Sequence, residues 1–268
     1  PEVTMTHARP CAQPAPRSSF FVVGRAGRAA RALVTAACAL ALAMGALTLA
    51  PTPAQAADPI TTQEYFSYYH LDTARAKGYT GKGVTIALID GPVDTSTPEL
   101  AGATIIDKSR CTIEASPQGA RHGTDMATIL VSPYTGVAPD ATLHSYQLSN
   151  YESISAGTCE VNGKKLDDFD TLINQAVDDG AQIISISQGT GRLGDDVKWA
   201  IANAIARGVI IVASAGNTAD NANNAHLGSW SGVVGVSAIN TDGTFASYSS
   251  WGNGVVTAAV GGPFNRLD

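Results

Sequence analysis

The feature that most limits the fold of this chain is a regular alternation, after residue 80, between short aliphatic runs and longer amphipathic segments. The runs are rich in Val, Ile and Leu, as is typical of strands that are covered on both faces. They span residues 84–89, 142–148, 183–187, 209–213 and 233–238. Strands separated by helices in this way favour an α/β fold with a mostly parallel central sheet.

Three segments between these runs are predicted to be helical, at residues 124–130, 169–179 and 195–207. In the second segment apolar residues recur at helical spacing, and Asp167 and Asp168 stand at its start, where the helix dipole favours negative charge. Gly180 and Gly208 follow the last two segments and predict where those helices end. The pattern indicates one large domain over residues 57–268.

The first 56 residues are predicted to be a leader rather than part of this fold. An Arg-rich stretch precedes an apolar run over residues 32–49, and Ala54-Gln55-Ala56 then forms a small-residue cleavage site. A transmembrane anchor is the alternative, but the run is Ala-rich and near the lower length limit for a membrane span. We therefore expect a signal peptide that is cleaved after Ala56, a secreted, extracellular protein, and no stable membrane anchor in this chain.

The charge of the chain argues against two classes of partner. The net charge is −6, and without the five Arg and one Glu of the leader it is about −10. Binding to nucleic acid or to anionic lipid depends on positive charge, so we expect neither. A nucleotide-binding α/β protein is also disfavoured, because no Gly-x-Gly-x-x-Gly follows the first run.

Four cysteines are present, and two of them, Cys11 and Cys38, lie in the leader. Cys111 and Cys159 remain, and an even number in an exported chain predicts a disulfide, with two buried free thiols as the alternative. Because the two cysteines are 48 positions apart, the bond would stabilise the fold by about 4 kcal/mol.

Three polar residues fall where strands or turns place chemistry in an α/β sheet. Asp90 follows the first run, His122 comes 32 residues later at the predicted start of a helix, and Asn217 follows the fourth run. A carboxylate can orient a histidine that acts as a general base, and a side-chain amide can donate to an oxyanion. Each residue alone also has an ordinary role in a turn or at a helix end. Only the three together, in this order, indicate a catalytic site.

The order and surroundings of these residues resemble the subtilases, the subtilisin-like serine peptidases. The similarity runs from about Tyr65 to Gly262. The matching segments are Tyr79–Asp90, His122-Gly123-Thr124, Gly136–Ala141, Ile184–Gly189, Ala215-Gly216-Asn217 and Ala246–Gly252.

This resemblance implies a three-layer subtilisin-like fold and a serine endopeptidase that cleaves protein or peptide substrates in extended conformation, without a cofactor. Asp90 would orient the imidazole of His122, which would act as general base and then general acid. Asn217 would donate a hydrogen bond to the oxyanion. The residues implied to hold the substrate main chain or to form the wall of its primary pocket are Ser187, Gln188, Gly189, Ala213, Ser214, Ala215 and Gly216.

The nucleophile of the family lies in a Gly-Thr-Ser-x-Ala segment, and no Gly-Thr-Ser occurs in these 268 residues. We therefore expect a partial chain of an active peptidase that stops before the serine. Ser249 and Ser250 belong to a strand-turn region and are not expected to replace it. The alternative is a secreted pseudopeptidase that binds extended peptides without cleaving them.

Further departures from the family pattern lie close to the expected site. Gly91 stands where Ser or Thr usually follows the catalytic Asp, Asp125 stands in place of a second His, and Thr97 replaces another His. The loop that forms a calcium site in many relatives is reduced to Ser132–Gly136. This loop has too few oxygen ligands for calcium, so we expect no metal site and weak or absent calcium binding.

Overall fold

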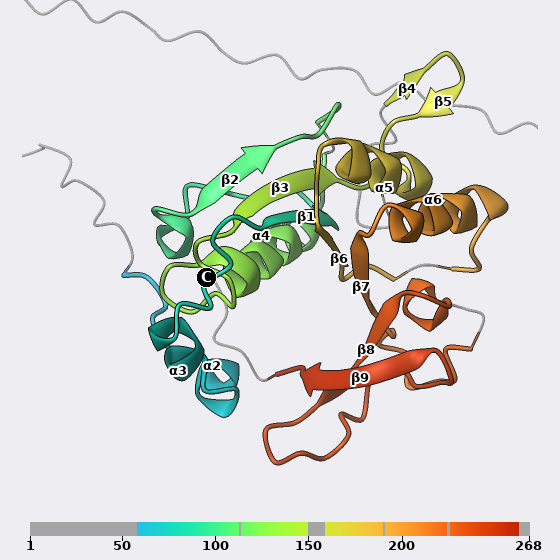
Figure 1. Cartoon of the computed structure of the whole chain (residues 1–268). Helices are drawn as coiled ribbons and strands as arrows, with labels where there is room; N and C mark the ends of the chain where they lie inside the picture. Colours follow the sequence, from blue (N-terminus) through green and yellow to red (C-terminus); the bar gives the residue numbers. More distant parts are fainter. Residues whose placement is uncertain (1–57, 113, 150–158, 190, 224–225, 263–268) are drawn as a thin grey trace, which may run out of the picture. The chain divides into compact units, whose positions relative to one another are not determined.

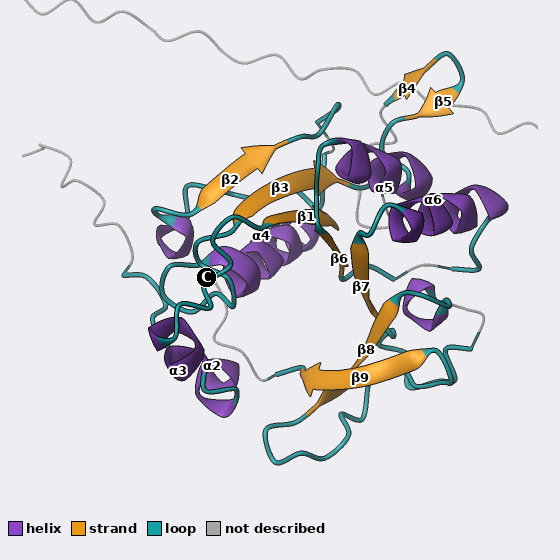
Figure 2. Cartoon of the chain, in the orientation of Figure 1, coloured by secondary structure: helices purple, strands orange, loops and turns teal. Residues whose placement is uncertain are grey.

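The computed structural model describes residues 58–112, 114–149, 159–189, 191–223 and 226–262. In this part of the chain, one parallel sheet of seven strands has the order β2-β3-β1-β6-β7-β8-β9 (Figures 1 and 2). The strands are β1 (Thr85–Asp90), β2 (Thr104–Asp107), β3 (Thr142–Gln147), β6 (Ile183–Ile186), β7 (Ile210–Ser214), β8 (Val234–Ile239) and β9 (Val255–Val260). A small antiparallel hairpin is formed by β4 (Glu160–Val161) and β5 (Lys164–Lys165). The predicted leader and its cleavage site lie outside the described residues.

Three longer helices complete the layers: α4 (Pro117–Val131), α5 (Phe169–Asp178) and α6 (Asp195–Ala206). Leu172 and Ile173 of α5 and Ile201 of α6 pack with one set of alternate strand residues, while Ala127 and Val131 of α4 pack with the other set. Helices therefore lie on both faces of the sheet, which confirms the three-layer α/β fold. None of the helices in the described ranges has the length and hydrophobicity to span a bilayer.

The helix that carries His122 differs from the prediction. The sequence pattern placed its start at Thr124, whereas α4 begins at Pro117. The side chain of Ser116 accepts a hydrogen bond from the Gly119 N–H at 3.0 Å, and Pro117 occupies the first turn, so a good N-cap and an N-terminal proline start the helix early. His122 consequently lies within the helix and not before its start.

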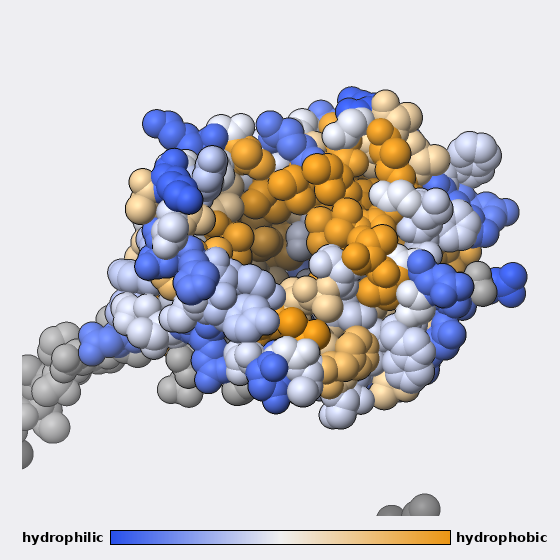
Figure 3. Space-filling model, turned by 60° about the horizontal axis from the view of Figure 1, so that its bottom comes forward, coloured by the Kyte–Doolittle hydropathy of each residue, from blue (hydrophilic) through white to orange (hydrophobic). Residues whose placement is uncertain are grey.

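The sheet face that carries α4 is only partly covered by the described residues. On this face α4 packs over β1 and β3, whereas Ile210 of β7 is 52% exposed and Val212, Val234 and Val236 are partly exposed. Figure 3, which brings the lower side of Figure 1 forward, shows apolar side chains around a hollow. Strands inside a parallel sheet are normally buried on both faces, so this surface is unusually apolar for contact with water.

Two short helices near the start of the domain, α2 (Glu64–Tyr68) and α3 (Leu71–Ala76), bind the turn over residues 132–136. The Arg75 guanidinium donates to the carbonyl oxygens of Pro133 at 2.9 Å, Tyr134 at 3.2 Å, Ser132 at 3.4 Å and Gly136 at 2.5 Å. The hydroxyl of Tyr65 donates to the remaining carbonyl, that of Thr135, at 2.9 Å. The five carbonyls of the turn thus accept hydrogen bonds from α2 and α3, four of them from one cation.

We expect Arg75→Gln to destabilise the protein strongly, because it leaves the converging carbonyls without their charged donor. Loss of charge-assisted hydrogen bonds of this kind costs about 2 to 3 kcal/mol, which corresponds to a fall in Tm of roughly 5–10 °C at this chain length. Because the guanidinium already occupies these oxygens, a chelator is expected to leave the Tm of the unmodified protein unchanged. Thermal unfolding followed by circular dichroism measures both effects.

The matched control is Arg207→Gln. Arg207 forms an ion pair with Asp178 at 2.6 Å, but both side chains are largely exposed, at 49% and 70%. Exposed pairs contribute about 0–1 kcal/mol, so the Tm of this variant should hardly change. Equal Tm losses in the two variants, or a clear Tm loss with chelator, would show that Arg75 does not have the proposed role in the turn.

Candidate active site

The candidate site lies at the carboxyl ends of neighbouring strands. Strand β1 pairs with β3 on one side and with β6 on the other, and β6 pairs with β7. Connections that leave a central strand toward opposite edges open a crevice at its carboxyl end. Asp90 is the last residue of β1, Ser187–Gly189 follow β6, and Ser214–Asn217 end and follow β7. All the predicted site segments except His122 therefore lie along this one edge.

Two glycines allow α4 to approach this edge closely. A Cβ added at Gly91 would lie 2.2 Å from the carbonyl oxygen of Gly119, and one added at Gly123 would lie 2.4 Å from the carbonyl oxygen of Gly91. The backbones of α4 and of the loop after β1 are thus in direct contact. The Thr124 hydroxyl joins them further, because it accepts from the Asp94 N–H at 3.0 Å and donates to the Ala120 carbonyl at 2.9 Å.

This close approach brings His122 to Asp90. Nδ1 of the imidazole lies 2.7 Å from Oδ1 of Asp90. The Asp90 side chain is fully buried, while that of His122 is 36% exposed. An ionised carboxylate can only accept, so Nδ1 carries the proton and the lone pair of the neutral ring is on Nε2. This is the tautomer in which a histidine can act as a base toward a hydroxyl group.

Two further groups donate hydrogen bonds to Asp90, and the sequence analysis did not predict one of them, the side chain of Gln188. The Gly91 N–H and Nε2 of Gln188 each lie 2.7 Å from Oδ1. Oδ2 is also buried and no described group forms a hydrogen bond with it. Sequence reasoning assigned Gln188 to binding of the substrate main chain, which stays a prediction. Its side chain is buried against Asp90. This contact joins residues 98 positions apart, so no local sequence pattern could predict it.

The other predicted binding residues are placed unevenly. The side chains of Ala213 and Ala215 are buried, so they offer only main chain to a ligand, whereas Ser187, Ser214 and Gly216 are partly exposed and Gly189 and Asn217 are exposed. Gly216 has φ of 108°, a conformation that favours glycine, and a Cβ there would meet Nε2 of His226 at 3.0 Å. Gly216 therefore turns the chain after β7 and brings Asn217 to the surface at the edge of the sheet.

Ser249 and Ser250 have structural partners. Both residues are buried. The Ser249 hydroxyl accepts from the Ala238 N–H at 2.8 Å, and the Ser250 hydroxyl donates to Oδ1 of Asp220 at 2.7 Å. These contacts hold the strand-turn region in place, and the expectation that neither residue is a nucleophile stays a prediction.

The disulfide predicted for the exported chain is present between Cys111 and Cys159, whose Cα atoms are 5.7 Å apart. It joins the segment before α4 to the segment before β4. No group of three His, Cys, Asp or Glu side chains in the described ranges is arranged to hold a metal ion. The chelator experiment described above tests the prediction of weak or absent calcium binding.

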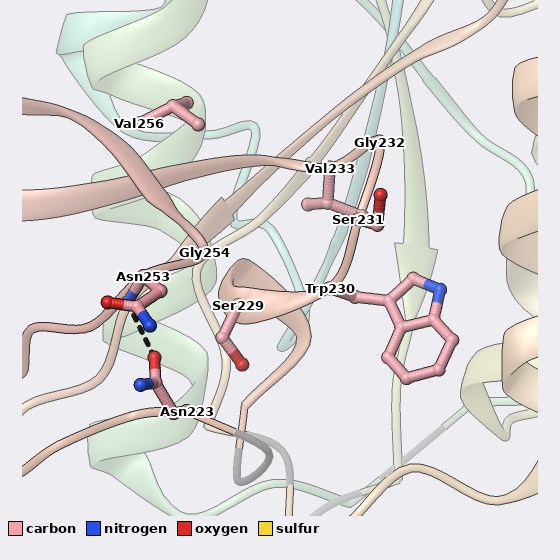
Figure 4. A pocket seen from close by; sticks show the side chains of 9 residues that line it. All are labelled: Asn223, Ser229, Trp230, Ser231, Gly232, Val233, Asn253, Gly254 and Val256. Atoms are coloured by element: carbon pink, nitrogen blue, oxygen red, sulfur yellow. Dashed lines mark hydrogen bonds between the residues drawn. The ribbon is translucent and has the colours of Figure 1, made fainter.

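A second hollow, of about 530 Å³, lies away from these residues. Figure 4 shows its lining, in which Trp230 and Val233 lead into β8 and Gly254 leads into β9. It therefore lies near the amino ends of these strands, opposite to the edge that carries Asp90. The Asn253 N–H donates to Oδ1 of Asn223 at 2.6 Å across it. Its lining residues carry no charge and no titratable group, so we assign it no catalytic role.

The chain is similar in sequence to known subtilisins and to thermitase. The chain is 26% identical to subtilisin E of Bacillus subtilis over 199 residues, which is 69% of this chain and 49% of subtilisin E. It is 29% identical to thermitase of Thermoactinomyces vulgaris over 189 residues, 68% of this chain and 64% of thermitase. The match thus spans about half the length of subtilisin E and of subtilisin NAT.

Solved structures show the same fold. The prenylagaramide maturation protease PagA superposes with a TM-score of 0.57 at 25% identity, covering 74% of this chain and 73% of that one. MycP1 from Mycobacterium smegmatis superposes with a TM-score of 0.58 at 24% identity, covering 81% and 66%. The Peptidase_S8 model, described as the Subtilase family, matches residues 81–264, which is well over half of the sequence. The chain therefore belongs to the Subtilase family.

Proposed function

We propose that this chain provides the general base and the substrate-binding segments of a secreted serine endopeptidase. The observation that carries the proposal is the contact between the buried Asp90 carboxylate and Nδ1 of His122 at 2.7 Å. A buried carboxylate that fixes the tautomer of a partly exposed histidine is the arrangement that activates a serine hydroxyl. Family membership supports the same reaction type.

In the proposed reaction, Nε2 of His122 accepts the proton of a serine hydroxyl as its oxygen attacks the peptide carbonyl carbon. Asp90 stabilises the imidazolium that forms, and Asn217 donates to the oxyanion. His122 then gives the proton to the leaving amine, so the C–N bond breaks and an acyl-enzyme remains, which water hydrolyses by the same steps. The serine is supplied by a Gly-Thr-Ser-x-Ala segment that these 268 residues do not contain.

The segments after β6 and β7 are proposed to bind the substrate main chain. Gly189 is exposed, and a Cβ built there would contact no atom within 4 Å. A peptide in extended conformation can therefore approach the backbone here, as a strand approaches a sheet edge. The export proposal rests on the leader sequence, on the disulfide, which forms in oxidising compartments, and on the similarity to subtilisins.

The test compares the natural-length gene product with the 268-residue chain, using casein as substrate and a serine-directed phosphonate as label. The longer protein is expected to hydrolyse casein and to be labelled. The shorter chain is expected to do neither, because without the nucleophile no acyl-enzyme can form. Labelling of the 268-residue chain would mean that one of its own serines is the nucleophile.

A secreted pseudopeptidase that binds extended peptides without cleaving them is the second candidate, because the exposed backbone at Gly189 suits peptide binding with or without cleavage. The gene sequence distinguishes the two candidates. A Gly-Thr-Ser-x-Ala segment in frame supports the peptidase. A stop codon after Asp268 supports the peptide-binding protein, which should then bind an extended peptide without cleaving it.

A further inference from the structure

Gln188 approaches the buried Asp90 carboxylate from the loop after β6, the strand next to β1, and we propose that it is a positioning residue for the Asp90–His122 pair. The family resemblance assigns Gln188 only to substrate binding; the present inference comes from its side-chain contacts. It rests on the proposed function, because the orientation of this pair matters for catalysis only if the protein is a peptidase.

The hydrogen bonds of Asp90 are concentrated on one oxygen. Oδ1 accepts from the Gly91 N–H, from Nδ1 of His122 and from Nε2 of Gln188, each at 2.7 Å. Oδ2 is buried, and within the described residues nothing forms a hydrogen bond with it. The direction of the carboxylate therefore depends on the donors to Oδ1 alone.

These three donors are not equivalent. The N–H of Gly91 belongs to the peptide group that follows Asp90, so it moves together with that residue. His122 is the group that must itself be oriented. Gln188 is the independent donor, because it reaches Asp90 from the end of β6, 98 residues further along the chain. Without it, the carboxylate could rotate and exchange its two oxygens at the imidazole.

The position of the amide suits this role. Nε2 of Gln188 lies 3.2 Å from Nδ1 of His122, so both nitrogens approach the same oxygen from neighbouring directions. Residue Gln188 is only 7% exposed, so bulk water has little access to replace its amide. A neutral amide also adds no charge beside the imidazolium that forms during the reaction, which a lysine or arginine would do.

The first test uses the unmodified 268-residue chain, labelled with ¹⁵N. The side-chain NH₂ signals of Gln188 are expected to shift as His122 titrates, because the amide donates to the carboxylate that holds the ring. Gln175 is the internal control, since its equally buried amide donates to the Lys108 carbonyl at 2.8 Å, away from the site. Gln188 signals that stay constant through the titration of His122 overturn the proposal.

The second test compares Gln188→Met with Gln175→Met. Methionine keeps the length of the side chain and removes its donor. In Gln188→Met the NMR signal of the Nδ1–H proton of His122 is expected to broaden or shift. The charged residues beside His122 on its helix, Arg121 and Asp125, are identical in the variant and the unmodified protein, so they do not account for such a change. In the natural-length protein kcat should fall about 10- to 100-fold, as for loss of one hydrogen bond to a charged group, with KM little changed.

Gln175→Met should leave the Nδ1–H signal and kcat unchanged. An unaltered Nδ1–H signal together with an unaltered kcat in folded Gln188→Met overturns the positioning role. If Gln188→Met does not fold, the titration of the Gln188 amide in the unmodified chain decides the question. If the natural-length protein hydrolyses nothing, the proposed function fails, and the two NMR measurements still decide whether Gln188 positions the pair.

Discussion

Replacing His122 with alanine in the natural-length protein is expected to lower kcat by about four to six orders of magnitude, a size taken from subtilisin. In the proposed mechanism Nε2 of His122 removes the serine proton and returns it to the leaving group, and Asp90 places no other group of the described site to do so. KM for a peptide substrate should change little, because the binding segments stay in place. Steady-state hydrolysis of a chromogenic peptide measures both constants.

Asp90→Asn should lower kcat by about four orders of magnitude, because an amide can donate to Nδ1 and stabilise the wrong tautomer. The control is His70→Asn. His70 is exposed and has φ of 51°, a conformation that asparagine tolerates, so this variant should keep full activity. Phosphonate labelling that survives His122→Ala would show that a different base activates the nucleophile.

Gly91→Ser is expected to lower both stability and activity, although serine is common at this position in the family. A Cβ at residue 91 would lie 2.2 Å from the Gly119 carbonyl oxygen and 3.0 Å from its carbon. Neither atom is the end of a flexible side chain, so α4 or the loop after β1 must move. We expect a loss of about 3 kcal/mol in the free energy of unfolding, at the upper end for overpacking.

The same displacement should lower kcat about 100-fold, since Asp90 precedes Gly91 and His122 lies on the helix that moves, and misplacement by about 1 Å has effects of that size. Gly191→Ser is the matched control, because a Cβ at Gly191 contacts nothing within 4 Å. Chemical denaturation and peptide hydrolysis give the two readouts. A Gly91→Ser protein as stable and active as Gly191→Ser would contradict the backbone contact described here.

Much of the sheet was predictable, because each interior strand is a continuous run of aliphatic residues that can be recognised from the sequence alone. The runs for β1, β3, β6, β7 and β8 agree with the structure to within about one residue at either end. The two edge strands were not predicted: β2 (Thr104–Asp107) and β9 (Val255–Val260) both consist mostly of exposed or partly exposed residues, and β2 is short. The start of α4 was missed because Gly119 and Gly123 are poor helix formers, although Ser116-Pro117 is a recognisable cap.

Two residues of the candidate site, Asp90 and His122, were also predictable from the sequence. Asp90 and His122 lie within a recognisable motif each, and the structure brings their side chains together. The contact of the Gln188 side chain with Asp90 was not predictable, because it depends on which strand lies beside β1 in the folded sheet. The reason for glycine at position 91 was equally hidden, since it depends on the carbonyl of Gly119 in a helix that starts 26 residues later.

The Arg75 guanidinium in the turn over residues 132–136 also affects how the stability of the turn depends on the calcium concentration of the medium. A bound ion stabilises a protein by an amount that rises with the logarithm of its free concentration, and this contribution disappears on dilution. A cation that is covalently part of the chain is present at a fixed effective concentration and cannot be diluted away. The stability of this turn should therefore be the same in calcium-poor and calcium-rich media, and the ion cannot serve as a signal that loosens it.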